Sequence, residues 1–272
     1  MKNIIIINQN KYFYLISKFL FEYLTKYFNN IQLIDYDNSY KYTDDIYILF
    51  YILDNLPKNY IVYNFEQFTT NKIWKESYFN FLNKSLFNID YSINNIIILH
   101  KKNINSYFLP FHSLKLFKYP KNIIKDIDIL FIGNINDRRK KWLNKLNNFN
   151  IKICKDIFYD KSLELFARSK ILLNIHYYDG ISILEITRIL PALENNCIIL
   201  SESSNDEYYN LIYNDIIKIT NIDNIYNDIN NILENYIYYY EYLINNLSKI
   251  NNNIYNNNLL DLINYIINLK TL

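Results

Sequence analysis

The feature that most constrains the fold of this chain is a series of short, continuous apolar runs. The runs are Ile4–Ile7, Ile31–Ile34, Ile46–Ile52, Tyr60–Tyr63 and Ile96–Leu99 in the first half, and Asp128–Ile132, Ile151–Cys154, Ile171–Ile175 and Cys197–Leu200 in the second. Because they do not alternate with polar residues, they fit strands that are covered on both faces, as in a parallel sheet.

Segments with helical periodicity lie between these runs. Tyr12–Phe28 and Trp142–Phe149 are the clearest, and the chain from about Asn221 onward is also helical in period. Repeated strand–helix–strand units predict doubly wound α/β sheets. At 272 residues, of which 50% are hydrophobic, the chain is long enough for two small domains.

The passage from Phe108 to Pro120 loses this periodicity and contains two prolines, so it is the candidate linker. We place the domain boundary near residue 120. The prediction is therefore two Rossmann-like domains facing a cleft, one formed by residues 1–120 and the other by residues 121–272, including the C-terminal helices.

Charge and cysteine usage restrict the partners and the compartment. A net charge of +2 gives no field that would attract nucleic acid or an anionic membrane. Cys154 and Cys197 lie alone inside apolar runs, which favours reduced thiols over a disulfide. The apolar run at the start of the chain is too short for a signal peptide or a membrane span. These features predict a soluble protein of the cytoplasm.

Several well-known chemistries have no motif here. The sequence contains no CxxC, HExxH, P-loop or GxSxG element, and its two glycines exclude GxGxxG. His100, His112 and His176 are dispersed, so we predict no metal site.

Polar clusters follow three of the predicted strands in the second half: FIGNINDRRKK, LNIHYYDG and IILSESSNDE. Ligands of open parallel sheets bind beyond the carboxyl ends of the strands, where these clusters lie. Both glycines of the chain, Gly133 and Gly180, fall within them. Each glycine either permits tight packing of strand and helix or lets a ligand approach the backbone.

The basic cluster Arg138 to Lys141 is expected in the first turn of a helix capped by Asn136 or Asp137. Cations are unfavourable at a helix start unless an anion is bound there. The cluster therefore predicts a phosphate site, with a solvated surface run as the alternative.

His176 and Glu185 are the other candidates for chemistry. His176 follows a predicted strand, and Glu185 lies within an apolar segment expected to be helical from Ile181 to about Leu190, where Pro191 ends or kinks the helix. A buried carboxylate needs a partner. Glu185 either pairs with Arg188, three residues on, or accepts hydrogen bonds from the vicinal hydroxyls of a ribose. His176 has a structural role or contacts a ligand.

These pieces together resemble glycosyltransferases of the two-Rossmann-domain GT-B fold, and specifically the group-1-like branch with CgeB-type transferases of bacteria and giant viruses. The similar stretches of the first half are IVYNFEQF, NIDYSINNIIIL and YFLPFHS, and those of the second are DILFIGNINDRRKKWL, SKILLNIHYYD, ILEITRI and IILSE. They occur in the family's order along most of the chain.

The resemblance implies a nucleotide-sugar donor in the second domain and an acceptor on the side of the first. Arg138 and Arg139 match diphosphate-binding residues, and Glu185 matches the carboxylate that holds the donor ribose. The full set expected at the donor is Gly133, Asn134, Arg138, Arg139, Tyr177, Gly180, Glu185, Ser201 and Glu202. Two departures are that Tyr177 occupies the place of a second acidic residue and that the family's glycine-rich turn is reduced to Gly180.

The expected function is therefore transfer of a sugar from a nucleotide diphosphate sugar to a glycan, protein or lipid acceptor, without cofactor or divalent metal. His176 is the candidate catalytic group. Glu66 is a second candidate, as a base on the acceptor side, with a helix-capping role as its alternative. The alternatives in function are an inactive binding or assembly module of the same fold, or a nucleotide-sugar epimerase or phosphorylase.

Overall fold

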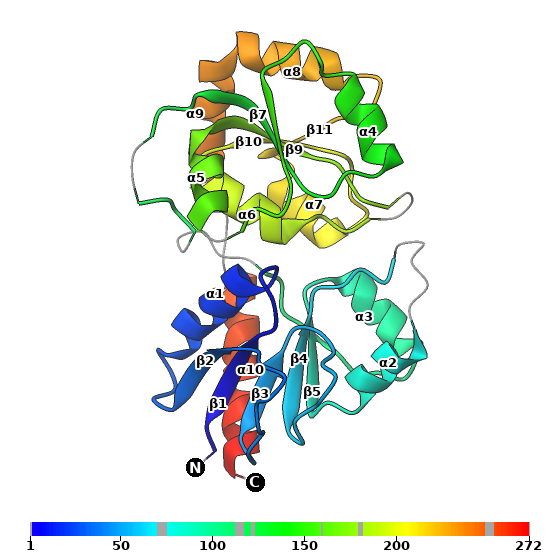
Figure 1. Cartoon of the computed structure of the whole chain (residues 1–272), viewed down its shortest axis with the longest axis vertical. Helices are drawn as coiled ribbons and strands as arrows, with labels where there is room; N and C mark the ends of the chain where they lie inside the picture. The colour runs from blue at the N-terminus through cyan, green and yellow to red at the C-terminus, as the bar shows by residue number, and fades with distance from the viewer. Residues whose placement is uncertain are drawn as a thin grey trace. The chain divides into compact units, whose positions relative to one another are not determined.

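The computed structural model describes residues 2–69, 75–111, 117–120, 123–158, 160–178, 182–247 and 253–271. The chain forms two compact units, Met1–Phe111 together with Asn252–Leu272, and His112–Asn251. Each unit is a parallel sheet with helices packed against it (Figure 1). The sequence therefore predicted the architecture of both units correctly.

The first unit contains a six-stranded sheet of order β2-β1-β3-β4-β5-β6, in which every neighbouring pair is parallel. Its strands are β1 (Ile4–Asn8), β2 (Ile31–Asp35), β3 (Ile46–Leu49), β4 (Tyr60–Asn64), β5 (Phe87–Asp90) and β6 (Tyr107–Phe108). Its helices are α1 (Tyr14–Leu24), α2 (Glu76–Asn83), α3 (Ile93–His100) and α10 (Asn253–Thr271).

The strands β1, β3 and β4 at the middle of this sheet are buried on both faces, which explains why they read as unbroken apolar runs. All five residues of β1 are buried, and Ile5 and Ile7 share a core with Phe79 and Leu82 of α2 and Leu99 of α3. We interpret the many tyrosines of this unit as core residues with a polar end, because Tyr60 Oη, for example, donates to a backbone carbonyl 2.7 Å away.

The second unit contains a five-stranded sheet of order β11-β10-β9-β7-β8, also parallel throughout. Its strands are β7 (Ile127–Ile132), β8 (Ile151–Cys154), β9 (Ser169–Asn174), β10 (Ile198–Ser201) and β11 (Ile217–Ile219). Its helices are α4 (Asp137–Asn144), α5 (Asp160–Arg168), α6 (Ile186–Glu194), α7 (Glu207–Tyr213), α8 (Ile225–Glu234) and α9 (Tyr236–Leu247).

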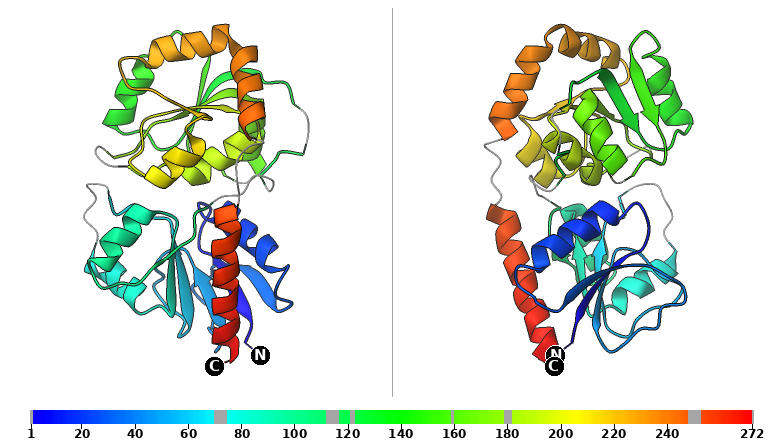
Figure 2. Two further views of the ribbon diagram at one scale, coloured as in Figure 1. Left: turned by 180° about the vertical axis from the view of Figure 1, so that it is seen from behind. Right: turned by 60° about the vertical axis from the view of Figure 1, so that its left-hand side comes forward.

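The domain assignment needs two corrections. The chain passes to the second unit after Phe111, inside the predicted linker but before residue 120. The last helix, α10, belongs to the first unit and not to residues 121–272 (Figure 2). Tyr265 of α10 stacks on Phe87 at 4.3 Å between ring centroids, and Asn258 Nδ2 donates to the carbonyl of Phe108 at 2.9 Å.

Some elements also differ from the sequence prediction. Ile96–Leu99 belongs to helix α3 and is not a strand, because a short apolar run fits a buried helix face as well as a strand. The short strands β5, β6 and β11 were not predicted. Cys154 and Cys197 are both free, as expected. Among the described residues, no helix is long and apolar enough to cross a membrane.

Candidate functional site

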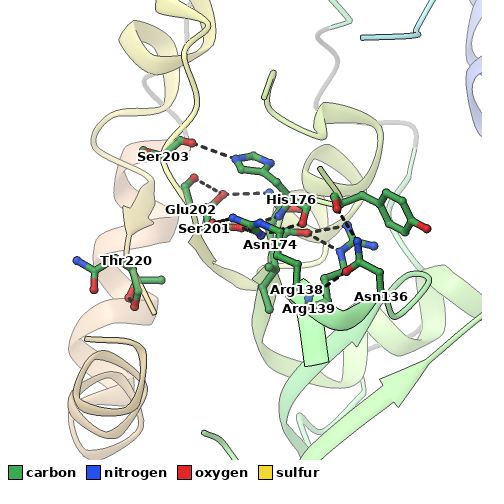
Figure 3. A network of polar contacts seen from close by, with 12 residues as sticks. Asn136, Arg138, Arg139, Asn174, His176, Ser201, Glu202, Ser203 and Thr220 are labelled. Carbon is green, nitrogen blue, oxygen red and sulfur yellow. Dashed lines mark hydrogen bonds and ion pairs between the residues drawn. The ribbon is translucent and has the colours of Figure 1, made fainter. Parts of the chain in front are cut away.

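The second sheet changes direction of strand order between β7 and β9, since β8 lies on one side of β7 and the later strands lie on the other. Such a switch point, at the carboxyl ends of the strands, is where open α/β sheets bind ligands. Polar side chains from the ends of β9 and β10 and from the start of α4 meet there in one hydrogen-bonded network (Figure 3).

The start of α4 holds the chain segment that follows β9. Asn136, one of the two residues predicted as the cap, is the N-cap, and its Oδ1 accepts from the backbone N–H of Arg139 at 3.0 Å. Its Nδ2 donates to the carbonyl of Tyr177 at 2.7 Å, while Arg138 Nη1 donates to the carbonyl of His176 at 3.0 Å. Arg139 donates to the carbonyl of Ile175, so the start of α4 binds three consecutive carbonyls.

This arrangement explains why the sequence elements NDRR and NIHYY occur together. The first supplies donors and the second supplies the carbonyls that accept them, across the β7–β9 switch point. Arg138 and Arg139 of the basic cluster therefore have a structural role, which neither interpretation of the sequence included.

Arg139 is buried, with 3% of its surface exposed. Its Nε and Nη2 donate to the carbonyl of Ile175 at 3.0 and 2.6 Å, and Nη1 donates to the carbonyl of Asn134 at 2.8 Å. Its guanidinium also lies 5.3 Å from the ring centroid of Phe131 and 5.2 Å from that of Tyr177. Burial lowers the pKa of Arg139 to about 10, so the group stays charged at neutral pH.

Gly133 lies directly against this guanidinium. Its φ is 154°, and a Cβ atom at this position would come within 2.9 Å of Arg139 Nη1. The Gly133 N–H already donates to the carbonyl of Cys154 at 3.0 Å. The structure therefore supports tight packing as the reason for this glycine.

Arg138 forms the second link of the network. Its guanidinium pairs in bidentate fashion with the Glu202 carboxylate, through Nη1 to Oε2 at 2.7 Å and through Nη2 to Oε1. Glu202 Oε2 also accepts from the backbone N–H of His176 at 2.7 Å. With 22% of its side chain exposed, Arg138 is more accessible than Arg139.

Both ring nitrogens of His176 are hydrogen-bonded within the protein. Nδ1 lies 3.0 and 2.9 Å from the two oxygens of Glu185, and Nε2 lies 3.0 Å from the carbonyl of Ser203. A carbonyl only accepts, and so does an ionised carboxylate, so both nitrogens carry protons and the ring is an imidazolium. Burial alone would lower the pKa of His176, but the Glu185 carboxylate outweighs it and the pKa is raised above 6.5.

Glu185 is correspondingly an anion. Burial alone would raise the pKa of its carboxyl group, but His176, Arg188 and a 2.9 Å hydrogen bond from Asn174 Nδ2 lower it to about 2. Glu185 is paired with His176; among the described residues, Arg188 makes no ion pair with it within bonding distance, and the buried Nη1 of Arg188 lacks a hydrogen-bond partner.

The helix that follows Glu185 differs from the expected Ile181–Leu190. Glu185 is the N-cap residue of α6, with φ −73° and ψ 63°, and the helix runs through Pro191 to Glu194. Pro191 therefore lies inside the helix and does not end it. The apolar pattern correctly predicted a helix but not its start.

The remaining predicted donor residues that the structure describes lie at the same edge of the sheet. Ser201, at the end of β10, accepts from Asn174 Nδ2 at 3.0 Å and donates to the carbonyl of Glu202 at 2.8 Å. Tyr177 is 40% exposed beside Arg139, and Asn134 contributes its carbonyl. Gly180 lies outside the described residues.

Glu66 belongs to the first unit and follows β4. Its carbonyl accepts from Asn95 Nδ2 at 2.7 Å, and its N–H donates to Asn64 Oδ1 at 3.2 Å. Asn64 and Asn95 both donate to the buried carboxylate of Asp90, at 2.6 and 3.0 Å. Glu66 does not cap α2, which begins ten residues later at Glu76.

Two members of the second-unit network, Asn174 and Ser203, were not predicted from the sequence. Asn174 ends an apolar strand with a fully buried amide, and its Oδ1 has no partner among the described residues. A polar residue at the end of an apolar run was the available indication. Ser203 contributes only its carbonyl, which no sequence pattern reveals. The described residues contain no group of three or more His, Cys, Asp or Glu placed to hold a metal ion.

Comparison with known proteins gives distant relatives and a clear fold. No family model matches the sequence. The chain is 25% identical over 261 residues to the uncharacterized protein L140 of Acanthamoeba polyphaga mimivirus. This alignment covers 88% of this chain and 85% of that protein. It is 31% identical over 189 residues to the uncharacterized protein R358 of the same virus, covering 62% and 65%.

Among solved structures, the chain is similar to sucrose-phosphate synthase from Thermosynechococcus elongatus, with a TM-score of 0.63, 8% identity, and coverage of 99% of this chain and 100% of that one. It is similar to Anabaena HepE in complex with UDP and glucose, with a TM-score of 0.58, 8% identity, and coverage of 97% and 100%. A mutant of S. aureus TarM in a complex with UDP gives a TM-score of 0.53 at 13% identity; the alignment covers 81% of this chain and 55% of TarM. These similarities show that the two units have the GT-B fold of glycosyltransferases.

Proposed function

We propose that this protein transfers a sugar from a nucleotide diphosphate sugar to an acceptor. The observation that carries the proposal is the charge at the β7–β9 switch point. Among the described residues, the cationic groups Arg138, Arg139 and His176, with Arg188 beside Glu185, face two carboxylates, Glu185 and Glu202. An excess of cations where the fold binds its ligands favours a polyanion such as a diphosphate.

In this proposal, different residues bind different parts of the donor. Arg138 and the start of α4 bind the diphosphate, because a helix N-terminus and an accessible guanidinium both favour phosphate oxygens. Glu185, 16% of whose side chain is exposed, accepts hydrogen bonds from the ribose hydroxyls. The same cations stabilise the diphosphate as it leaves, so we propose transfer without a divalent metal.

The first experiment measures UDP binding and UDP release. We expect wild-type protein to bind UDP in calorimetry and to release UDP slowly from a UDP-sugar panel, with no loss of activity in EDTA. Arg138→Gln should weaken UDP binding by roughly tenfold, because a charge-assisted contact is lost. Lys141→Gln, an exposed cation on the same helix, is the matched control. Absence of binding by any nucleoside diphosphate in wild-type protein would refute the proposal.

One observation favours a second candidate, an inactive binding or assembly module of the same fold. Arg139, His176 and both oxygens of Glu185 are already hydrogen-bonded within the protein, so the network is structurally complete by itself. This candidate predicts UDP binding without release of UDP from any donor, with or without added acceptors. Measuring binding and release on the same samples separates the two functions.

The finer assignments belong to this proposal. The order of the sequence motifs supports a place in the CgeB-like, group-1-like branch of GT-B enzymes, and the relatives from mimivirus agree with a giant-virus type. The cysteine usage and charge support a cytoplasmic location. A glycan, protein or lipid acceptor would then be found by incubating the enzyme and a labelled donor with fractionated cell extract.

A further inference from the structure

His176 lies at the centre of the network but offers nothing to a ligand. Both of its ring nitrogens are bonded, and only 3% of its surface is exposed. A group that touches the reacting bond needs a free nitrogen aimed at the substrate. The geometry therefore argues against the catalytic role that the sequence suggested, and it points to another role.

We propose that His176 is a positioning residue that holds the Glu185 carboxylate in the orientation in which it binds the ribose of the donor. This inference rests on the proposed function, since it assumes that Glu185 contacts the ribose. Nδ1 contacts both carboxylate oxygens, at 3.0 and 2.9 Å, so it fixes the plane of the carboxylate as well as its distance.

The carboxylate keeps acceptor capacity for a ligand while it is held. Its two oxygens offer about four lone-pair sites. Nδ1 of His176 and Nδ2 of Asn174 occupy part of them, and Oε2 receives the larger share. Oε1 therefore retains a free site, and 16% of the side chain of Glu185 is exposed.

The imidazole is itself held from its other side. Nε2 donates to the carbonyl of Ser203, and the backbone N–H of His176 donates to Glu202. When the imidazolium loses a proton, the remaining proton stays on Nδ1, because the carboxylate is a stronger acceptor than the Ser203 carbonyl. Nε2 then faces the carbonyl without a proton, so the ring loses this second contact as well as the charge that strengthens its bond to Glu185. His176 therefore holds Glu185 most firmly while it is an imidazolium.

Charged groups from several elements set the titration of His176. Glu185, at the start of α6, and Glu202, after β10, favour the imidazolium. The cations nearby are Arg138 and Arg139 from α4 and Arg188 from α6. With its nearest charge an anion, the imidazolium persists to higher pH than an isolated histidine, so the positioning of Glu185 should weaken only as pH rises beyond the ordinary pKa of histidine.

Two substitutions separate the contacts of the ring. His176→Asn places an amide donor near the position of Nδ1, so it keeps a neutral hydrogen bond to Glu185. His176→Gln places its donor near Nε2, so it keeps the bond to Ser203 and loses the one to Glu185. At about pH 6 we expect UDP affinity to fall roughly fivefold in the Asn variant and tenfold or more in the Gln variant.

The pH dependence gives a second readout. UDP titrates identically in all samples, so the ratio of wild-type to variant affinity reports on His176 alone. We expect the advantage of wild-type protein over the Asn variant to shrink as pH rises from about 6 and the imidazolium loses its proton.

The outcomes distinguish this inference from the proposed function. If Glu185→Gln weakens UDP binding but both His176 variants bind as tightly as wild-type protein, Glu185 does not need His176 and the inference is wrong. If the His176 variants keep UDP affinity and lose only turnover, His176 acts on the reacting bond and the inference is again wrong. If wild-type protein binds no UDP, the proposed function fails first.

One measurement does not depend on the folding of a His176 variant. Nuclear magnetic resonance of the three histidines follows their titration directly in wild-type protein and in Glu185→Gln. We expect the midpoint of His176 to fall in the variant while the other two histidines are unchanged. An unchanged midpoint would show that the two groups are not coupled in solution, which would overturn the inference.

Discussion

Gly133 and Arg139 provide a direct test of the packing at the β7–β9 switch point. Gly133→Ala adds a Cβ atom 2.9 Å from Arg139 Nη1, at a φ of 154° that residues other than glycine rarely adopt. Backbone strain of this kind costs roughly 1–3 kcal/mol, and the contact adds to it. We expect Gly133→Ala to destabilise the second unit by about 2–3 kcal/mol.

Arg139→Met keeps the length of the side chain but removes every donor. The carbonyls of Ile175 and Asn134 then lose the guanidinium, at roughly 1–3 kcal/mol for each buried acceptor. Part of this loss is offset, because a buried cation without a hydrogen-bonded carboxylate no longer has to be desolvated. The expected net destabilisation is about 2–3 kcal/mol.

The double variant decides whether the two residues act through each other. Methionine has no atom at the position of Nη1, so the contact with the added Cβ disappears. The loss of stability in the double variant should be smaller than the sum of the two single losses by about 1 kcal/mol. Urea unfolding followed by Trp142 fluorescence, in a Trp74→Phe background, reports on the second unit. Lys141→Met, an exposed site on α4, is the control and should shift stability by less than about 0.5 kcal/mol.

Strict additivity would refute this reasoning. Gly133 would then be required for a reason other than Arg139, and ligand approach to the backbone would become the better explanation. Reduced UDP affinity in Gly133→Ala, without any change in stability, would lead to the same conclusion.

Three further predictions concern the charges and the two units. The pKa of Glu185 is lowered from 4.5 to about 2, so its contribution to the free energy of unfolding is complete above pH 4.5 and is lost as pH falls towards 2. The pKa of His176 is raised above 6.5, so the stabilisation by the pair weakens again as pH rises beyond that value. The stability difference between wild-type protein and Glu185→Gln should therefore be greatest between these limits, at about 3 kcal/mol, and a difference independent of pH would contradict the pairing. Leu262→Ala, at a buried site of α10, should destabilise the first unit by roughly 2–5 kcal/mol and leave the Trp142 transition in place; a shifted Trp142 transition would assign α10 to the second unit. Lys125 donates to backbone carbonyls at the ends of α5 and α6, so Lys125→Met should cost about 2 kcal/mol in thermal unfolding, and an unchanged melting temperature would show that these contacts do not stabilise the fold.

Local patterns determined most of the architecture from sequence. Unbroken apolar runs predicted parallel sheets, because only strands covered on both faces lack polar alternation. The run at Ile171–Ile175 and the basic cluster after Ile132 placed the candidate site at adjacent strand ends, and the helix cap was narrowed to Asn136 or Asp137. Each of these features depends on residues within one turn or one strand of each other.

The type of an element was predicted wrongly where the apolar pattern was too short to distinguish a strand from a helix. Ile96–Leu99 has the composition of a buried strand, yet it forms part of α3, since four apolar residues fit either structure. The start of α6 was also beyond local reasoning. Glu185 takes a non-helical conformation while its carboxylate is bound to His176 and Asn174, and those partners come from the preceding strand and its end.

The partners of the charged residues were decided by tertiary structure alone. Sequence spacing offered Arg188 as the partner of Glu185 and a ligand as the partner of Arg139. In the fold, His176 pairs with Glu185, nine residues on, while Arg138, after β7, meets Glu202, after β10, because β7, β9 and β10 end at the same edge of the sheet. Arg139 donates to backbone carbonyls instead. A sequence shows which residues carry charge, but the order of strands in the sheet decides which charges meet, because that order brings together residues that lie far apart along the chain.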